Sequence, residues 1–350
     1  MTSKWIALTM MLSALPAWAE TLKGSSQAVT AIEAKPQLEL FTGPKSKLLS
    51  APVFPRSEQH KGREGWVQLG MMISPEGRSY EVVITDSTGN DAFEAAALKA
   101  AEKWIFDPAL MNGVPIDAGG NFKVKFALEG GALGASSKFV RAMRRLKRHF
   151  KNDNQKNADI EFEKMRVQNL YEDAFLNIAR FNYYEKWGDE QQQLNALRRG
   201  IAHEDDANYL PKKLFLSALL SKFRLEVKLR DFAAALHTWE VFEKKSANNK
   251  IKEMLRKIVI DIERLANDDR SYVVTGRIGA DFSWNYRLLK RQFNIVIESG
   301  EIAEIKLRCE KKYVFFRYDP KINYHISDNY GSCGIELVGN PNTKFSLVQS

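Results

Sequence analysis

The chain has 350 residues, of which 44% are hydrophobic and 11% aromatic, and it carries a formal net charge of +9. At about 100–200 residues per domain this length predicts two or three domains, and the composition excludes large-scale disorder. The positive charge favours polyanionic neighbours such as anionic lipid head groups or acidic peptides. The sequence has no nucleic-acid-binding motif, so nucleic acid is not an expected partner.

The first residues have the pattern of an export signal. Lys4 precedes an apolar run over Trp5–Leu15, and the small-x-small triplet Ala17-Trp18-Ala19 follows. This order predicts a signal peptide over residues 1–19, cleaved after Ala19, and therefore a periplasmic protein. The competing interpretation, an uncleaved membrane anchor, is disfavoured because the run is shorter than the roughly 20 apolar residues that a spanning helix needs.

Residues 20–50 mix Ser, Thr, Lys and Pro with scattered apolar positions, which predicts a short tether. The next stretch, residues 51–128, carries two strand-like runs, an amphipathic helix and a third strand. The last run alternates apolar and polar residues, which predicts one buried face and one face in water. These elements are expected at Trp66–Ile73, Val82–Thr85, Ala92–Trp104 and Phe122–Leu128.

Several short motifs punctuate this stretch in a fixed order. They are Pro52-Val53-Phe54-Pro55, Glu64-Gly65-Trp66-Val67, Glu76-Gly77, Val82 to Gly89, Ala95 to Ala100, Trp104-Ile105-Phe106-Asp107-Pro108-Ala109 and Asn112-Gly113-Val114-Pro115. In these motifs residues 51–128 resemble the C-terminal domain of TonB, with Phe54 where that family has Tyr. The resemblance covers under a quarter of the chain.

The resemblance implies a ββαβ domain that grips an extended peptide of an outer-membrane transporter by adding it as a strand to its sheet edge. Lys123 and Lys125 also fit a second interpretation, protection of an exposed edge against aggregation. The chain lacks the family's transmembrane anchor and Pro-rich spacer, so we expect an accessory role. The peptide-binding residues carried over by resemblance are Pro52, Phe54, Pro55, Phe122, Lys123, Val124, Lys125 and Phe126.

A Gly-rich linker is expected over residues 129–137, followed by an all-α domain over residues 138–270. The first helix, Lys138–Lys151, combines an apolar stripe with many basic residues. One interpretation places this helix on an anionic membrane surface or an acidic partner. The other, which we favour, packs the stripe into a helical core and leaves the charges solvated.

Two helical segments, Ala174–Gly200 and Leu216–Phe242, share one layout, with a short turn between two helices. This layout is loosely similar to tetratricopeptide repeats. The spacing between the two turns is longer than the 34 residues of such a repeat, and an irregular helical bundle fits equally well. Either arrangement predicts an interaction surface without chemistry.

Residues 271–350 return to strand-like periodicity and predict a small all-β domain, with Ser299-Gly300-Glu301 as a hairpin connection. Cys309 and Cys333 are the only cysteines, and in an oxidising compartment they favour a disulfide. Two buried free thiols are the alternative. The bond would stabilise the fold by about 3 kcal/mol in the chain-entropy model.

Nothing in the sequence predicts catalysis, a cofactor or a metal site. The five histidines, His60, His149, His203, His237 and His325, lie singly and without metal-ligand spacing. A cell-wall hydrolase is the best enzymatic alternative, but no nucleophile motif supports it.

The sequence therefore predicts a multidomain α+β protein with three parts: a TonB-like domain, an all-α repeat-like domain and a small all-β domain. Its expected function is non-catalytic binding of envelope proteins, such as TonB-dependent outer-membrane receptors or components of a TonB system. The alternative is a structural adaptor for envelope assembly that binds peptidoglycan or lipid. A membrane role would use residues Lys138–Lys151 as the peripheral contact.

Overall fold

The computed structural model describes residues 41–129, 134–202 and 209–350. The predicted signal peptide, residues 1–19, and most of the predicted tether, residues 20–50, lie outside the described residues. The described residues all belong to one unit of contacts, Leu40–Ser350.

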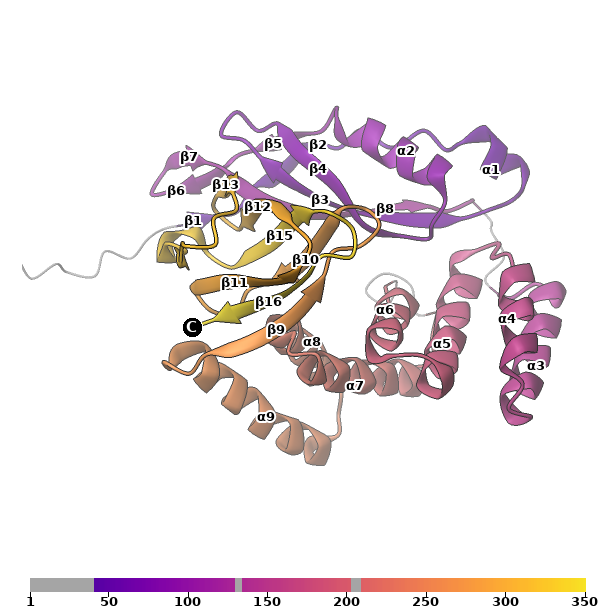
Figure 1. The fold of residues 1–350 in the computed structure, drawn as a ribbon. Helices are drawn as coiled ribbons and strands as arrows, with labels where there is room; N and C mark the ends of the chain where they lie inside the picture. Colours follow the sequence, from indigo (N-terminus) through magenta and orange to yellow (C-terminus); the bar gives the residue numbers. More distant parts are fainter. Residues whose placement is uncertain (1–40, 130–133, 203–208) are drawn as a thin grey trace, which may run out of the picture. The chain divides into compact units, whose positions relative to one another are not determined.

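The first sheet has the predicted ββαβ order (Figure 1). Its strands are antiparallel and lie in the order β4-β3-β8. Helix α2 covers one face, because Phe93 and Ala97 of the helix are buried against Leu69 of the central strand. The bounds are β3 Gly65–Ile73, β4 Ser79–Ser87, α2 Asp91–Ala101 and β8 Ala118–Phe126.

Strand β8 differs in position from the expected strand, Phe122–Leu128. It begins four residues earlier, at Ala118, and ends at Phe126. The early start includes Gly119 and Gly120, which have low strand propensity and so hide the strand from a sequence pattern. At the other end the chain leaves the sheet, and the Leu128 amide donates to the Glu64 carboxylate at 3.0 Å.

Several short strands were not expected from the sequence. Strands β1 and β2 occupy part of the predicted tether and pair with β6 and β5. Strands β6 and β7 form a hairpin around Asn112-Gly113, whose positive φ angles of 51° and 82° suit this turn. The bounds are β1 Phe41–Thr42, β2 Lys45–Leu48, α1 Arg56–His60, β5 Ile105–Asp107, β6 Ala109–Met111 and β7 Val114–Ile116.

The middle region is helical, as predicted, and consecutive helices pack against one another (Figure 1). The two expected helix pairs are present as α5 with α6 and α7 with α8. Asp189 caps α6 through a reciprocal capping box with Gln192. Assignment of these pairs as tetratricopeptide repeats stays a prediction. The bounds are α3 Ser137–Lys151, α4 Gln155–Lys164, α5 Leu170–Trp187, α6 Glu190–Gly200, α7 Lys212–Lys228, α8 Phe232–Lys245 and α9 Asn249–Asn267.

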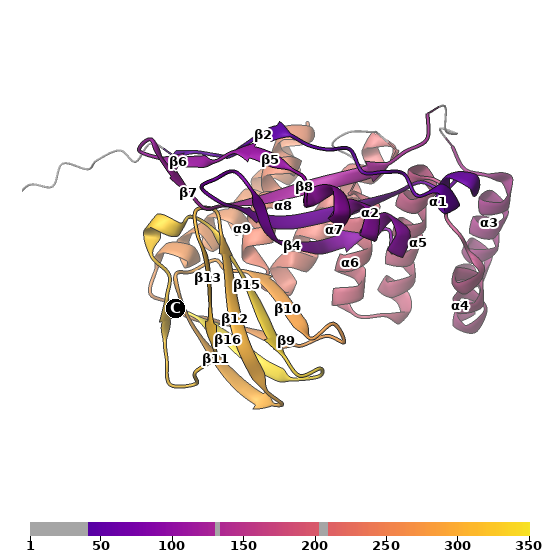
Figure 2. The ribbon, with the colours of Figure 1, turned by 90° about the horizontal axis from the view of Figure 1, so that it is seen from above.

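The C-terminal part contains two four-stranded antiparallel sheets that share one apolar core (Figure 2). The first has the order β10-β15-β12-β13, and the second has the order β14-β11-β16-β9. The bounds are β9 Tyr272–Arg277, β10 Ser283–Arg287, β11 Gln292–Ser299, β12 Ile302–Cys309, β13 Tyr313–Arg317, β14 Tyr324–His325, β15 Cys333–Gly339 and β16 Lys344–Gln349.

The predicted hairpin at Ser299-Gly300-Glu301 is wrong. The turn exists, with Gly300 at φ 90°, but β11 before it and β12 after it belong to different sheets. Strand β11 pairs with β14 and β16, whereas β12 pairs with β13 and β15. Turn residues identify a change of direction and do not identify the strand that will be the partner.

Cys309 and Cys333 form the predicted disulfide. They face each other across the β12–β15 ladder, and both side chains are buried. None of the helices in the described ranges combines the length and the apolar character needed to cross a bilayer.

Candidate functional site

The candidate site is the outer edge of β8. Within the described residues β8 pairs with β3 alone, so it is a terminal strand of its sheet. A terminal strand carries a row of outward backbone donors and acceptors, to which an extended peptide can add.

One contact shows which residues of β8 turn their backbone N–H and C=O groups away from β3. The Gly119 amide donates to the Glu310 carbonyl at 3.1 Å, so it faces away from β3. Backbone direction alternates along a strand, and the β3–β8 register is regular. Asn121, Lys123 and Lys125 therefore turn their backbone groups in the same outward direction as Gly119.

The apolar side chains predicted for peptide binding lie in the core instead. Val124 and Phe126 are 6% and 2% exposed, and the half-buried Phe122 packs its ring against Trp104 and Phe106 at centroid distances of 5.4 and 5.2 Å. These three residues hold β8 on the core under α2. Their side chains therefore cannot contact a partner strand at the edge.

The polar face of β8 is more enclosed than expected. Lys123 and Lys125 are half-buried, and the Lys123 ammonium donates a hydrogen bond to the Ala202 carbonyl after α6. The expectation that this face lies in water is therefore wrong, because the helical region of the same chain covers part of it.

The segment Pro52–Pro55, called the entry segment below, lies beside the end of β8 at Phe126. Pro52, Phe54 and Pro55 are half-buried, and the Phe54 ring meets Phe93 at 5.6 Å and Phe126 at 5.8 Å, both edge to face. The resemblance predicts that Phe54 lies near a bound peptide. In the structure Phe54 contacts β8 through its ring packing on Phe126 in the core.

Glu58 anchors this segment, although no sequence pattern singles it out. Its side chain is 4% exposed and accepts a hydrogen bond at 2.8 Å from Asn90, the residue that caps α2. Burial by itself raises the pKa of this carboxyl, but the hydrogen bonds that it accepts from Asn90, Lys61 and Arg63 outweigh that effect and lower the pKa from 4.5 to about 2.

We expect Glu58→Gln to lower the free energy of unfolding by about 2 kcal/mol near neutral pH, after allowance for solvent screening. A lowered carboxyl pKa stabilises the fold above about pH 4.5, and this contribution is lost as the pH falls towards about 2. Urea unfolding of both proteins across this range should show their difference shrinking with acid. A difference that stays constant would contradict the role of the charge.

The other end of β8 is held by the C-terminal sheets. Besides the Gly119–Glu310 bond, Lys312 lies 4.0 Å from the carboxylate of Asp117, the residue before β8. Arg308 donates to the carbonyl of Glu81 on β4, in the same sheet, at 2.9 Å. Gly119 suits this approach, since a Cβ there would stand 3.0 Å from the Cys309 carbonyl oxygen. The contact at Gly119 thus leaves Asn121 as the first outward-facing position of β8 beyond the C-terminal sheets.

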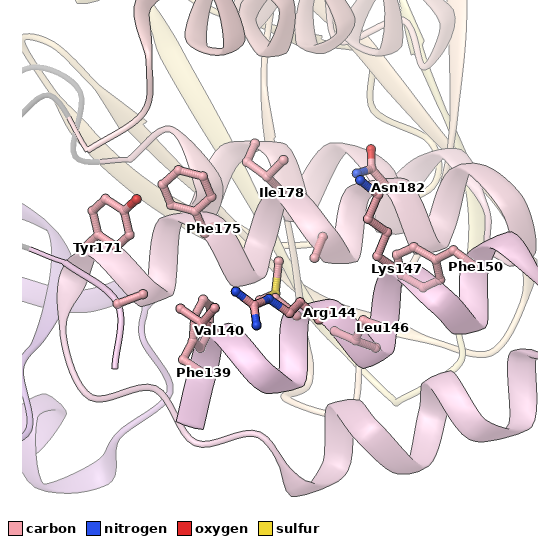
Figure 3. A pocket seen from close by; sticks show the side chains of 13 residues that line it. Phe139, Val140, Arg144, Leu146, Lys147, Phe150, Tyr171, Phe175, Ile178 and Asn182 are labelled. Carbon is pink, nitrogen blue, oxygen red and sulfur yellow. The ribbon is translucent and has the colours of Figure 1, made fainter. Parts of the chain in front are cut away.

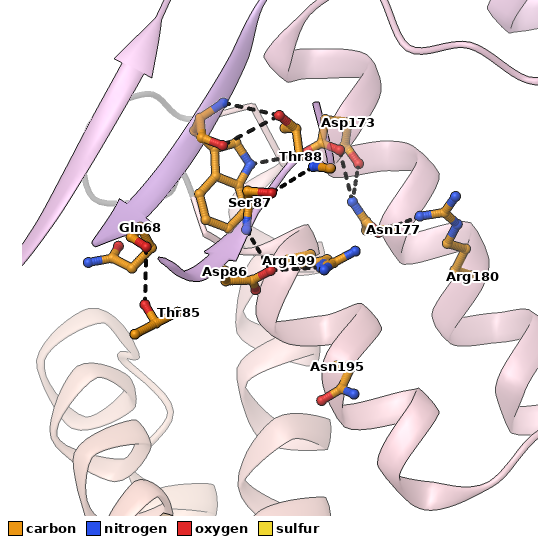
Figure 4. A network of polar contacts seen from close by, with 12 residues as sticks. Gln68, Thr85, Asp86, Ser87, Thr88, Asp173, Asn177, Arg180, Asn195 and Arg199 are labelled. Carbon is orange, nitrogen blue, oxygen red and sulfur yellow. Dashed lines mark hydrogen bonds and ion pairs between the residues drawn. The ribbon is translucent and has the colours of Figure 1, made fainter. Parts of the chain in front are cut away.

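A polar network joins β3 and the end of β4 to the helices (Figure 4). The buried Trp66 indole donates to Asp173 of α5 at 3.1 Å, and Arg199 of α6 pairs with Asp86 at 2.9 Å. Burial raises the pKa of Asp86, and the Arg199 charge opposes this effect. These contacts connect the TonB-like sheet to the helical region.

No group of three or more His, Cys, Asp or Glu side chains in the described ranges is arranged to hold a metal ion. His203 lies outside these ranges.

Comparison with known proteins addresses the same segment. Residues 50–128 match the family model described as Gram-negative bacterial TonB protein C-terminal. Protein TonB of Vibrio cholerae is 32% identical over 89 residues, which are 25% of this chain and 36% of that protein. Protein tonB2 of Pseudomonas aeruginosa is 36% identical over 59 residues, which are 17% of this chain and 22% of that protein.

A solution NMR structure of the Pseudomonas aeruginosa TonB CTD aligns with 25% of this chain and 89% of its own, at 26% identity and a TM-score of 0.23. The chain spans about a third or less of the length of the two curated relatives. Residues 50–128 form a TonB C-terminal domain, so the resemblance found in the sequence is confirmed.

Proposed function

We propose that this chain is a non-catalytic, periplasmic component of a TonB-type system. It binds an extended peptide of an outer-membrane receptor by pairing that peptide with β8. In this proposal the domain over residues 51–128 pairs with the peptide strand. The domains over residues 138–270 and 271–350 recruit or position further envelope proteins.

The observation that carries this proposal is a terminal strand in a domain of the TonB C-terminal family. Main-chain hydrogen bonds supply the affinity of such pairing. They need backbone groups that face outward on every second residue of the strand. The outward groups run from Asn121 towards the Phe54 end of the strand. Because the Gly119 amide already donates to the Glu310 carbonyl, the partner strand begins its pairing at Asn121.

Asn121→Pro tests the proposal, because proline removes an outward amide and leaves the bonds to β3 in place. We expect affinity recovery from outer-membrane extract to yield receptor proteins with the unchanged full chain and at least tenfold less with this variant. The main-chain pairing with the partner would lose its first donor.

Asn121→Ala is the matched control, since it removes the same exposed side chain and keeps the amide. It should recover receptors as the unchanged chain does. Equal recovery by the proline and alanine variants, with both folded by circular dichroism, would refute strand pairing at β8.

A further inference from the structure

A groove of about 490 Å³ lies between α3 and α5 (Figure 3). Phe139 and Val140 line it from α3, and Tyr171, Phe175 and Ile178 line it from α5. The volume falls in the range of about 300–1,000 Å³ that is usual for ligand sites, and the lining is mainly apolar. Such a groove suits an apolar side-chain row of a partner.

The charges at the groove have one sign. Arg144 and Lys147 are exposed and belong to its lining, which includes no Asp or Glu. Helix α3 itself has no acidic residue. Its basic side chains recur at spacings of three and four, as in Arg144 and Arg148, so they repel one another. Carboxylates supplied by a partner would relieve this repulsion.

Part of the apolar stripe of α3 is already packed inside the protein, at the base of the groove and beside it. Leu146 is fully buried, and Phe139 and Ala142 are nearly so, in a core shared with α4 and α5. Arg145 makes a two-pronged ion pair with Glu161 of α4. The apolar stripe is therefore turned inward, which favours an occupant that enters the groove over a flat bilayer surface that would need the stripe exposed.

The dimensions of the groove favour a helix. From Phe139 to Phe150, both in the lining, α3 extends about 16 Å at about 1.5 Å per residue. That length matches three turns of a partner helix, with apolar anchors at spacings of three, four and seven residues. Two helices already form the walls, and a third would complete the packing.

We propose that the α3–α5 groove binds an amphipathic helix of a partner protein, with its apolar face in the groove and acidic residues beside Arg144 and Lys147. This role is separate from strand pairing at β8, because it uses different residues and a different peptide conformation. Either activity can therefore fail without the other.

The test is a selection of displayed random peptides of about 16 residues on the immobilised full chain. A parallel selection on Arg144→Glu/Lys147→Glu removes peptides that bind elsewhere. We expect the peptides enriched on the unchanged chain to carry apolar residues at helical spacing flanked by Asp or Glu. Their affinity should fall at least tenfold on the double variant.

Arg141→Glu/Arg148→Glu is the matched control, because it makes the same charge change on exposed positions of α3 outside the groove lining. It should lower the affinity less than threefold. Equal losses in both double variants, or no enrichment over the parallel selection, would overturn the proposal. Pelleting with phosphatidylglycerol vesicles that depends on Arg144 and Lys147, without peptide enrichment, would overturn it in favour of lipid.

Discussion

Reducing the Cys309–Cys333 bond is expected to lower the stability of the C-terminal sheets by about 3 kcal/mol, because the bond closes a loop with a sequence separation of 24. Both sulfurs are buried, and the bond joins directly opposed residues of β12 and β15. The same loss is expected for Cys309→Ala/Cys333→Ala. Alanine is chosen over serine because serine would bury a hydroxyl without a hydrogen-bond partner. Hydrogen exchange of the β12 and β15 amides measures the effect locally.

Reductant should change exchange in the unchanged chain and have no effect on the double alanine variant. Amides of α2 should exchange alike in all samples, since α2 belongs to a separate apolar core. Unchanged protection of β12 and β15 after complete reduction would contradict this account. Glu310, next to Cys309, accepts the Gly119 amide, so looser sheets should also expose the start of β8.

Phe93→Ala is expected to lower the free energy of unfolding by about 3–5 kcal/mol, the range for a buried aromatic truncated to alanine. The ring is 1% exposed and stacks on Phe126 at a centroid distance of 4.5 Å. It also contacts Phe54, so its loss would separate the entry segment from β8. Urea unfolding followed by tryptophan fluorescence measures the change.

Phe315→Ala is the matched control, because that ring is 63% exposed on β13 and its removal should change the stability by less than about 0.5 kcal/mol. Similar small losses in both variants would show that the Phe54–Phe93–Phe126 cluster does not hold the domain together.

Local patterns predicted much of the fold. The apolar alternation of β3 and the helical spacing of α2 were sufficient, because each element buries a face that its own residues define. The basic helix was found in the same way, as α3. The disulfide followed from the number of cysteines and the expected compartment, and the TonB-like domain from its ordered motifs.

Features that depend on distant partners were not predictable. Strands β1 and β2 are exposed and short, and they form only because β6 and β5 come beside them from far along the chain. The groove depends on the gap between α3 and α5, whereas an apolar stripe reports only which face is buried. Glu58 carries no sequence signal, since its importance comes from Asn90, 32 residues away.

Disulfide cross-linking from Asn121→Cys tests the strand-pairing proposal most directly. The partner is a series of single-cysteine versions of an extended peptide from a receptor recovered with the chain. Side chains of adjacent strands on one face lie about 4.5–5.5 Å apart and alternate with the opposite face. We predict cross-links at every second peptide position, centred on one register. Efficient cross-linking at consecutive positions, or none at all, would contradict pairing of the peptide with β8.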